Sequence, residues 1–148
     1  MVFLSDGAGN GAGLAWEVLR RYIMVKRLAL PQQSWGAAES AALTPTMRIR
    51  GKVEQITVKI STATAGDITF TVAIADEDSA ALYSQATIAD AGTAIYGANS
   101  NKATQDAAFN AFLADGIVTF TITPSKAPGA SGVTVDVAVF VTGSNIPY

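Results

Sequence analysis

The sequence predicts a mainly β protein, an antiparallel β-sandwich or jelly roll preceded by an N-terminal helical or extended arm. After Met47, apolar and polar residues alternate in one short run after another, which is the pattern of half-buried strands. Turn sequences rich in Gly, Pro, Asp and Ser separate these runs at intervals typical of all-β domains. Hydrophobic residues make up 49% of the 148 residues, enough for the core of a single domain.

Residues 7–21, GAGNGAGLAWEVLRR, begin with four alternating glycines and raise the question of a nucleotide site. A dinucleotide-binding fingerprint needs G-x-G-x-x-G after a strand, but the third position counted from Gly7 is Ala12 and no strand pattern precedes it. A P-loop needs Lys and then Ser or Thr after its last glycine, whereas Leu14 follows Gly13. We therefore interpret this stretch as an adaptable leader and not as a phosphate site.

The arm that follows the leader has two possible structures. Residues 14–30 have a mostly helical spacing of apolar side chains, although Lys26 lies on the apolar face of that helix. The alternative is a helix that ends near Arg21, followed by a strand through YIMVKRLAL. Residues 31–46 contain two prolines and no strong period, so they are expected to be a linker. The expected organisation is an arm over residues 1–46 and a sandwich domain over residues 47–148.

The arm also carries the residues that we expect to bind a partner. Residues 1–59 hold eight Lys or Arg and four Asp or Glu, a balance of +4, and residues 60–148 hold two and eight, a balance of −6. One half could therefore attract the other, within a subunit or between subunits. The expected partner-binding residues combine apolar, aromatic and basic side chains: Trp16, Leu19, Arg20, Arg21, Tyr22, Ile23, Arg27 and Trp35.

Five clear strands are expected in the sandwich domain. The first covers residues 47–60 and has a basic outer face formed by Arg48, Arg50 and Lys52. Its alternation resumes one residue out of phase after Gln55, which indicates a β-bulge. The remaining strands are expected over residues 68–74, 82–88, 117–123 and 133–141, with a short additional piece at 93–96.

Two segments between these strands have other expected structures. Residues 107–113 have the spacing of one short helix turned towards the core. Asp76, Glu77 and Asp78 suggest calcium, but they lack the alternating spacing of an EF-hand loop, so a solvated hairpin turn is favoured. The isolated carboxylates in other predicted turns are expected to cap backbone groups: Asp67, Asp90 and Asp115.

The composition excludes several classes of function. The chain has no cysteine and no histidine, which excludes disulfides, a Ser-His-Asp triad and the commonest zinc ligands. We therefore expect no enzymatic activity, no cofactor, no metal and no small-molecule substrate. An isoelectric point near 4.9 argues against a nucleic-acid partner. No apolar run is long enough to cross a bilayer and no secretory signal is evident, so no membrane partner is expected.

The strand sequences resemble those of a class of viral proteins. The block ITVKISTATAGDITFTVAIADEDSAALYSQATI, followed by GIVTFTITPS and VTVDVAVFVTG, is similar in style to small β-sandwich structural proteins of bacterial viruses, such as capsid decoration (cement) and tail-associated proteins. This resemblance implies a location in the virion. It also implies that the chain forms homo-oligomers or binds other virion proteins, with terminal arms that clasp neighbours.

Two other functions stay open at this point. The chain could be a carbohydrate- or receptor-binding sandwich on a virus tail or a secreted protein, in which case Trp35, Tyr83 and Tyr96 would form an exposed site. A hydrolase with a carboxylate pair is disfavoured because no histidine is present and nothing in the sequence brings two aspartates together.

Overall fold

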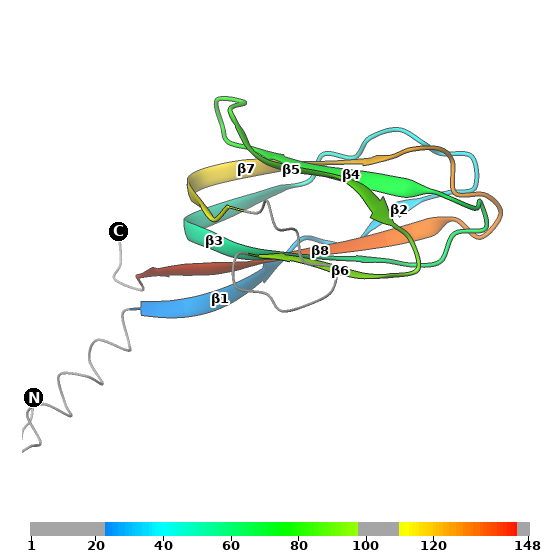
Figure 1. Cartoon of the computed structure of the whole chain (residues 1–148). Helices are drawn as coiled ribbons and strands as arrows, with labels where there is room; N and C mark the ends of the chain where they lie inside the picture. The colour runs from blue at the N-terminus through cyan, green and yellow to red at the C-terminus, as the bar shows by residue number, and fades with distance from the viewer. Residues whose placement is uncertain (1–22, 98–109, 145–148) are drawn as a thin grey trace, which may run out of the picture.

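A computed structural model describes residues 23–97 and 110–144, which form eight strands in two layers (Figure 1). The strands are β1 Ile23–Ala29, β2 Gln33–Trp35, β3 Thr46–Ile60, β4 Thr69–Ala75, β5 Ala81–Ala89, β6 Gly92–Gly97, β7 Phe112–Pro124 and β8 Val133–Ser144. All of their pairings are antiparallel. The predicted antiparallel sandwich is therefore confirmed.

One hydrogen-bonded sheet supplies both layers. Its order is β1-β8-β3-β7-β4-β5, with β2 also paired to β8 and β6 also paired to β3. β4, β5 and the second half of β7 lie in one layer, and β1, β6 and β8 lie in the other (Figure 1). The long strand β3 connects them, because its first half pairs with β7 and its second half with β8 and β6.

Two glycines accompany the passage of β3 and β7 between the layers. Gly51 in β3 has φ 133° and Gly116 in β7 has φ 131°, values that side chains with a Cβ rarely adopt. The register pairs Gly116 with Ile49 and Gly51 with Ala114, so the two glycines lie almost opposite each other. A Cβ on Gly51 would collide with the backbone oxygen of Thr142.

The core lies between the two layers and is formed by alternate residues of the strands. The aromatic pair Trp35 and Phe70 joins the layers, with ring centroids 5.5 Å apart in an edge-to-face arrangement. Trp35 comes from β2, beside β8, and Phe70 comes from β4. The alternating strand positions that are buried include Phe70, Val72 and Ile74 in β4, Val118, Phe120 and Ile122 in β7, and Val133, Val135, Val137, Val139 and Val141 in β8.

The predicted β-bulge in β3 is confirmed, and it lies at Glu54. Val53 pairs with Val141 and Gln55 pairs with Phe140, so Glu54 is the extra residue on β3. The bulge explains why both Val53 and Ile56 are fully buried although they are three residues apart. The sequence pattern placed the shift one residue later because it shows only where the new alternation begins.

The start of the sheet corrects two expectations. Residues 23–29 form β1, paired along their whole length with β8, so a helix through residue 30 is wrong there and the alternative strand is confirmed. Residues 14–22 lie outside the described residues. The expected linker contributes β2, and Leu43 bridges to Ile122 of β7. The described sheet therefore includes strands that precede Met47, because pairing with β8 outweighs the irregular local pattern.

The expected short helix over residues 107–113 is also corrected where it can be compared. Phe112 and Leu113 are the first residues of β7, and residues 107–109 lie outside the described part of the chain. Phe112 packs against the core, whereas Leu113 points outward. The apolar spacing that suggested a helix thus reflects the start of a strand, where one side chain in two is buried.

Candidate interaction surface

Exposed apolar side chains lie at the end of the sandwich where β1 begins and β8 ends. Among the described residues, the large hydrophobic side chains that are exposed are Val25, Leu113 and Ile117, at 64%, 75% and 42%. Val25 is paired with Thr142, Thr142 with Lys52, and Lys52 with Leu113. Val25 and Leu113 therefore belong to one row that crosses four neighbouring strands.

A strip of basic side chains runs along β3 beside the apolar residues of β7. Arg48 is paired with Ile117, Arg50 with Asp115, and Lys52 with Leu113. The three basic side chains are exposed, whereas Ile49 and Val53 on the other face of the strand are fully buried. The Arg50 Nε lies 3.3 Å from the Asp115 Oδ1, and the Lys52 Nζ lies 3.5 Å from the Glu54 Oε1. Both ion pairs are exposed to solvent, so they contribute little to stability.

The turn between β4 and β5 places acidic side chains on the other side of β7. The Asp76 carboxylate accepts hydrogen bonds from the backbone N–H groups of Asp78 and Ala80, at 3.0 and 2.8 Å, which confirms the predicted hairpin turn. The Glu77 carboxylate accepts a hydrogen bond of 2.8 Å from the backbone N–H of Ile117. This contact holds the turn against the first half of β7.

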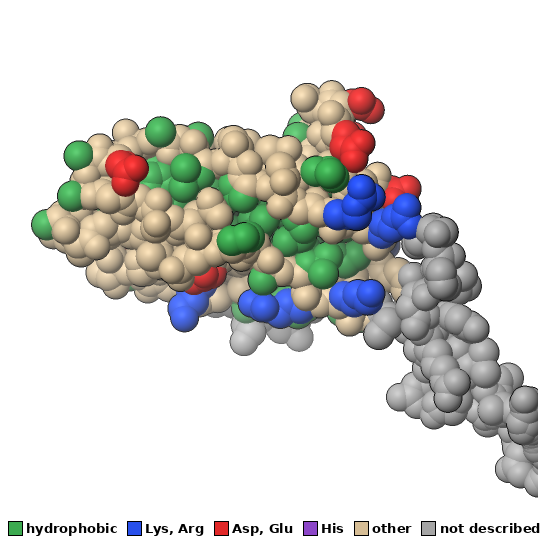
Figure 2. Space-filling model, turned by 180° about the vertical axis from the view of Figure 1, so that it is seen from behind, with side chains coloured by type: hydrophobic (Ala, Val, Ile, Leu, Met, Phe, Trp, Pro, Cys, Tyr) green, Lys and Arg blue, Asp and Glu red, His purple; other side chains and the backbone are tan. Residues whose placement is uncertain are grey.

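We define the end face as the three adjoining strips that result. The basic strip is Arg48, Arg50 and Lys52 of β3, the middle strip is Leu113, Asp115 and Ile117 of β7, and the acidic strip is Asp76, Glu77 and Asp78 of the β4–β5 turn. Figure 2 shows Lys and Arg side chains beside Asp and Glu side chains at one end of the molecule, on the right of the view. The Val25 row adjoins this face across β8.

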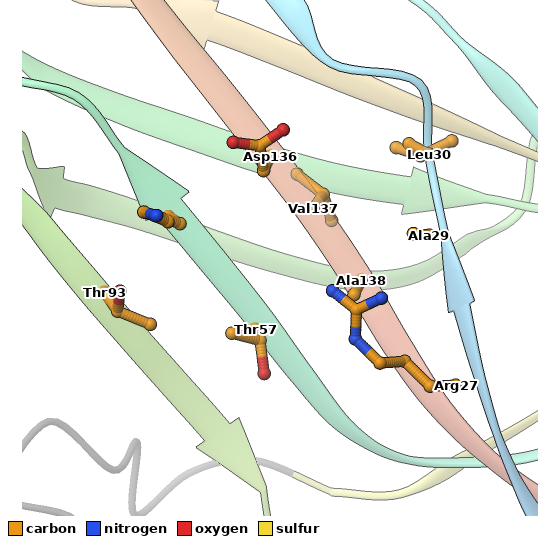
Figure 3. Close-up of a pocket in the computed structure, with 9 residues that line it drawn as sticks. Arg27, Ala29, Leu30, Thr57, Thr93, Asp136, Val137 and Ala138 are labelled. Carbon is orange, nitrogen blue, oxygen red and sulfur yellow. The ribbon is translucent and has the colours of Figure 1, made fainter.

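A separate hollow of about 300 Å³ lies on the outer side of the layer formed by β1, β8, β3 and β6 (Figure 3). Gln32 Nε2 donates hydrogen bonds of 3.2 and 3.1 Å to the two carboxylate oxygens of Asp136 at its edge. The hollow is lined by charged, polar and aliphatic residues, with no aromatic side chain among them: Arg27, Ala29, Leu30, Thr57, Lys59, Thr93, Asp136, Val137 and Ala138.

The structure separates the partner-binding residues expected from the sequence. Arg27 is exposed on β1 and lines the hollow, and Ile23 is the first residue of β1. Trp35 is only 3% exposed and donates its indole N–H to the Ala41 carbonyl at 2.8 Å, so its side chain belongs to the core and not to a contact surface. The other expected residues lie outside the described part of the chain: Trp16, Leu19, Arg20, Arg21 and Tyr22.

The aromatic residues proposed for sugar binding do not form an exposed platform. Trp35 and Tyr96 are buried, at 3% and 8% exposed. Tyr83 is partly buried and stacks on Phe112, with ring centroids 6.2 Å apart. No flat aromatic face is thus presented by Trp35, Tyr83 and Tyr96 for stacking on a sugar ring.

Sequence reasoning identified the basic strip but missed its apolar and acidic neighbours. The outward alternation of Arg48, Arg50 and Lys52 is visible in the sequence, whereas the spacing of residues 107–113 predicts a core-facing helix that includes Leu113. Leu113 and Ile117 are both odd-numbered, opposite in phase to the buried Val118 and Phe120. That phase, counted backwards from Phe120, is the signal that could have identified them as outward-facing.

Within residues 23–97 and 110–144, no three His, Cys, Asp or Glu side chains gather as a group that could hold a metal ion. The same part of the chain contains no helix with the length and apolar character needed to cross a membrane.

The fold is that of an all-β sandwich protein, and its end face combines exposed apolar and charged side chains. No protein-family model matches the sequence, and no curated protein is significantly similar to it. Among solved structures, a chain from the infectious bursal disease virus Gx strain aligns with a TM-score of 0.42 and 12% identity, over 85% of this chain and 33% of that chain. A chain from the Gt strain aligns with a TM-score of 0.38 and 10% identity, over 84% and 34%. This chain therefore spans about one third of the length of the chains it matches.

Proposed function

We propose that this chain is a structural subunit of a bacterial virus particle, a capsid decoration (cement) protein or another minor structural subunit, that acts by binding neighbouring subunits. The observation that carries the proposal is the end face, where Leu113 and Ile117 are exposed between charged strips. Exposed apolar surface rimmed by polar residues is typical of interaction sites, and here Leu113 and Ile117 lie on the same outward side of β7 with Asp115 between them. The resemblance of the strand sequences to virion sandwich proteins supports the same function.

Adhesion fits the acidic residues better than catalysis does. The Asp90 carboxylate accepts a hydrogen bond of 2.8 Å from the backbone N–H of Ala63, and Asp115 pairs with Arg50. Asp76 organises its own turn through two backbone N–H groups. Each of these carboxylates thus has a structural contact of the kind expected for turn and surface residues.

Carbohydrate binding is the second function considered, and the hollow of Figure 3 is the place it would use. Arg27, Lys59 and Asp136 could bind polar groups there, but the lining residues provide no aromatic face. A sugar would depend on hydrogen bonds alone, in competition with water. The end face therefore supports subunit binding better than the hollow supports sugar binding.

The proposal is tested on virus particles purified from a bacterial culture whose DNA encodes this chain. Antibodies raised against the purified chain should label intact particles in immunogold electron microscopy, and antibody pre-absorbed with the chain should not. In a second assay, the purified chain should attach to particles from which it has been stripped. Leu113→Asp should reduce this attachment about tenfold or more, because it places a charge in the contact. Thr123→Asp, at an exposed position in the far half of β7, is the matched control. Absence of the chain from purified particles would contradict the proposal.

A further inference from the structure

The order of the three strips on the end face is the starting point. β7 lies between β3 and the β4–β5 turn, because residues 112–119 pair with β3 and Glu77 contacts Ile117 from the opposite side. The basic strip and the acidic strip are therefore separated by a middle strip that contains Leu113 and Ile117. Basic residues from the first half of the sequence and acidic residues from the second half therefore meet on one surface.

We propose that the end face binds the end face of a second copy of this chain across a two-fold axis. A two-fold axis that runs along the middle strip, in the plane of contact, places the basic strip of each copy opposite the acidic strip of the other. The same rotation places each residue of the middle strip opposite itself: Leu113 faces Leu113, Ile117 faces Ile117, and Asp115, which is paired with Arg50, faces Asp115. This inference rests on the proposed function, which uses the same face, and it adds that the partner is a second copy of the chain.

The charges on the end face suit contact with an identical surface. The three basic residues Arg48, Arg50 and Lys52 nearly balance the four acidic residues Asp76, Glu77, Asp78 and Asp115. Within residues 23–97 and 110–144, neither Arg48 nor Asp78 forms an ion pair, whereas Arg50 and Asp115 pair with each other. Arg48 and Asp78 are thus the charges available to a partner, one on each outer strip.

The two ends of the sheet order are poorly suited to binding a second copy by adding a strand. β5 contains two register shifts relative to β4, and Thr87 within it has φ 61°, so its edge is irregular. β1 carries Lys26 in register with the buried Val141, which places a charge on the inward side of an edge strand. Both features are ways in which proteins prevent edge-to-edge pairing. Association is therefore expected through a face.

The parts of the interface have different roles. The apolar contacts of Leu113 and Ile117 supply most of the affinity, because burial of apolar surface is the main favourable contribution in protein association. The outer charges set the relative orientation and the association rate. Moderate salt should weaken the dimer without abolishing it, since the charged residues are exposed.

The test is a charge exchange, followed by sedimentation equilibrium of the full chain. Arg48→Glu alone places two acidic residues opposite each other in both halves of the dimer, and Asp78→Lys alone places two basic residues there. Each variant should weaken self-association about tenfold or more. An equimolar mixture of the two should restore dimers, because Glu at position 48 then faces Lys at position 78 and Asp78 faces Arg48.

The controls keep the outcomes distinct. Lys126→Glu, in the loop between β7 and β8, should leave the dimer unchanged, and circular dichroism should show that every variant is folded. A monomeric wild-type chain, unchanged association in the single variants, or no recovery in the mixture would each overturn the inference. Immunogold labelling of particles is read separately. If particles are labelled but the chain does not dimerise, the virion function stands and the partner is another protein. If the chain dimerises but particles are not labelled, the dimer stands and the virion function is wrong.

Discussion

Gly51 and Gly116 illustrate how single residues shape this sandwich. Each lies at a backbone conformation with φ near 130°, in the part of β3 and β7 that passes between the layers. At Gly116 a Cβ would lie 2.7 Å from the Glu77 Oε1, so the absence of a side chain also makes room for the acidic turn. The same residue thus serves the bend of β7 and the composition of the end face.

Gly51→Ala should lower the free energy of unfolding by about 2 kcal/mol or more, because a strained backbone conformation of this kind costs about 1–3 kcal/mol and the new Cβ meets backbone atoms of Thr142. Urea denaturation of the purified chain measures the change. Gly66→Ala is the control, since no atom lies within 4 Å of its Cβ position, and it should change stability by less than about 0.5 kcal/mol. Equal effects at both positions would show that β3 does not need glycine at residue 51.

At the scale of elements, β1 shows how an edge strand is kept from pairing further. Leu28 and Leu30 point towards the core, and Lys26 follows the same alternation at the end of the strand where it reaches solvent. The residue that fitted poorly into a helix therefore fits a protected edge. A charge on the inward side makes it costly to bury this edge under a neighbouring strand.

Lys26→Val should increase aggregation at high protein concentration, because it removes the inward-facing charge from the edge strand β1. The adjacent residue of the same strand, Val25, is already 64% exposed. Static light scattering measured over time follows this change. Lys59→Val removes the same charge from β3, which pairs with β8 and β6 on its two sides, and it should have a much smaller effect. If Lys59→Val aggregates as fast, net charge and not the edge is the cause.

At the scale of the whole molecule, the first strands close the sandwich around its core. β1 and β2 both pair with β8, and Trp35 packs on Phe70 in the opposite layer. The first described strand, β1, thus pairs with the last one, β8, and Ile23 lies opposite Ser144 (Figure 1). Residues 23–46 are structural parts of the domain for this reason. A binding arm is therefore proposed only for residues 1–22.

Deletion of residues 1–46 should prevent stable folding, because it removes β1, β2 and the buried side chains of Leu30 and Trp35. Deletion of residues 1–22 should leave a folded domain, since the described sheet begins at Ile23. Thermal unfolding followed by circular dichroism distinguishes the two. A cooperative transition that survives removal of residues 1–46 would return the domain boundary to Met47.

The sequence predicted the strands after Met47 because alternation is a local property. The five valines of β8 and the apolar run through Phe70 specify both a strand and its buried face, and the phase shift in β3 specified the bulge. The same local reasoning was wrong at Phe112 and missed β2, and it left residues 23–30 open between a helix and a strand, because short or irregular apolar spacing is compatible with more than one element. Pairing with a strand that is distant in the sequence decides between these elements, and a local pattern contains no information about that pairing.

The sequence by itself determined the fold class, most strand faces and the basic strip of β3, since each follows from side chains that alternate along one strand. Only the tertiary structure decided that β1 and β2 complete the sheet and that Trp35 is a core residue. It also decided that the basic strip, Leu113, Ile117 and the acidic turn form one surface. The physical reason is that this surface is assembled from β3, β7 and the β4–β5 turn, and their adjacency depends on backbone hydrogen bonds between segments far apart in the chain.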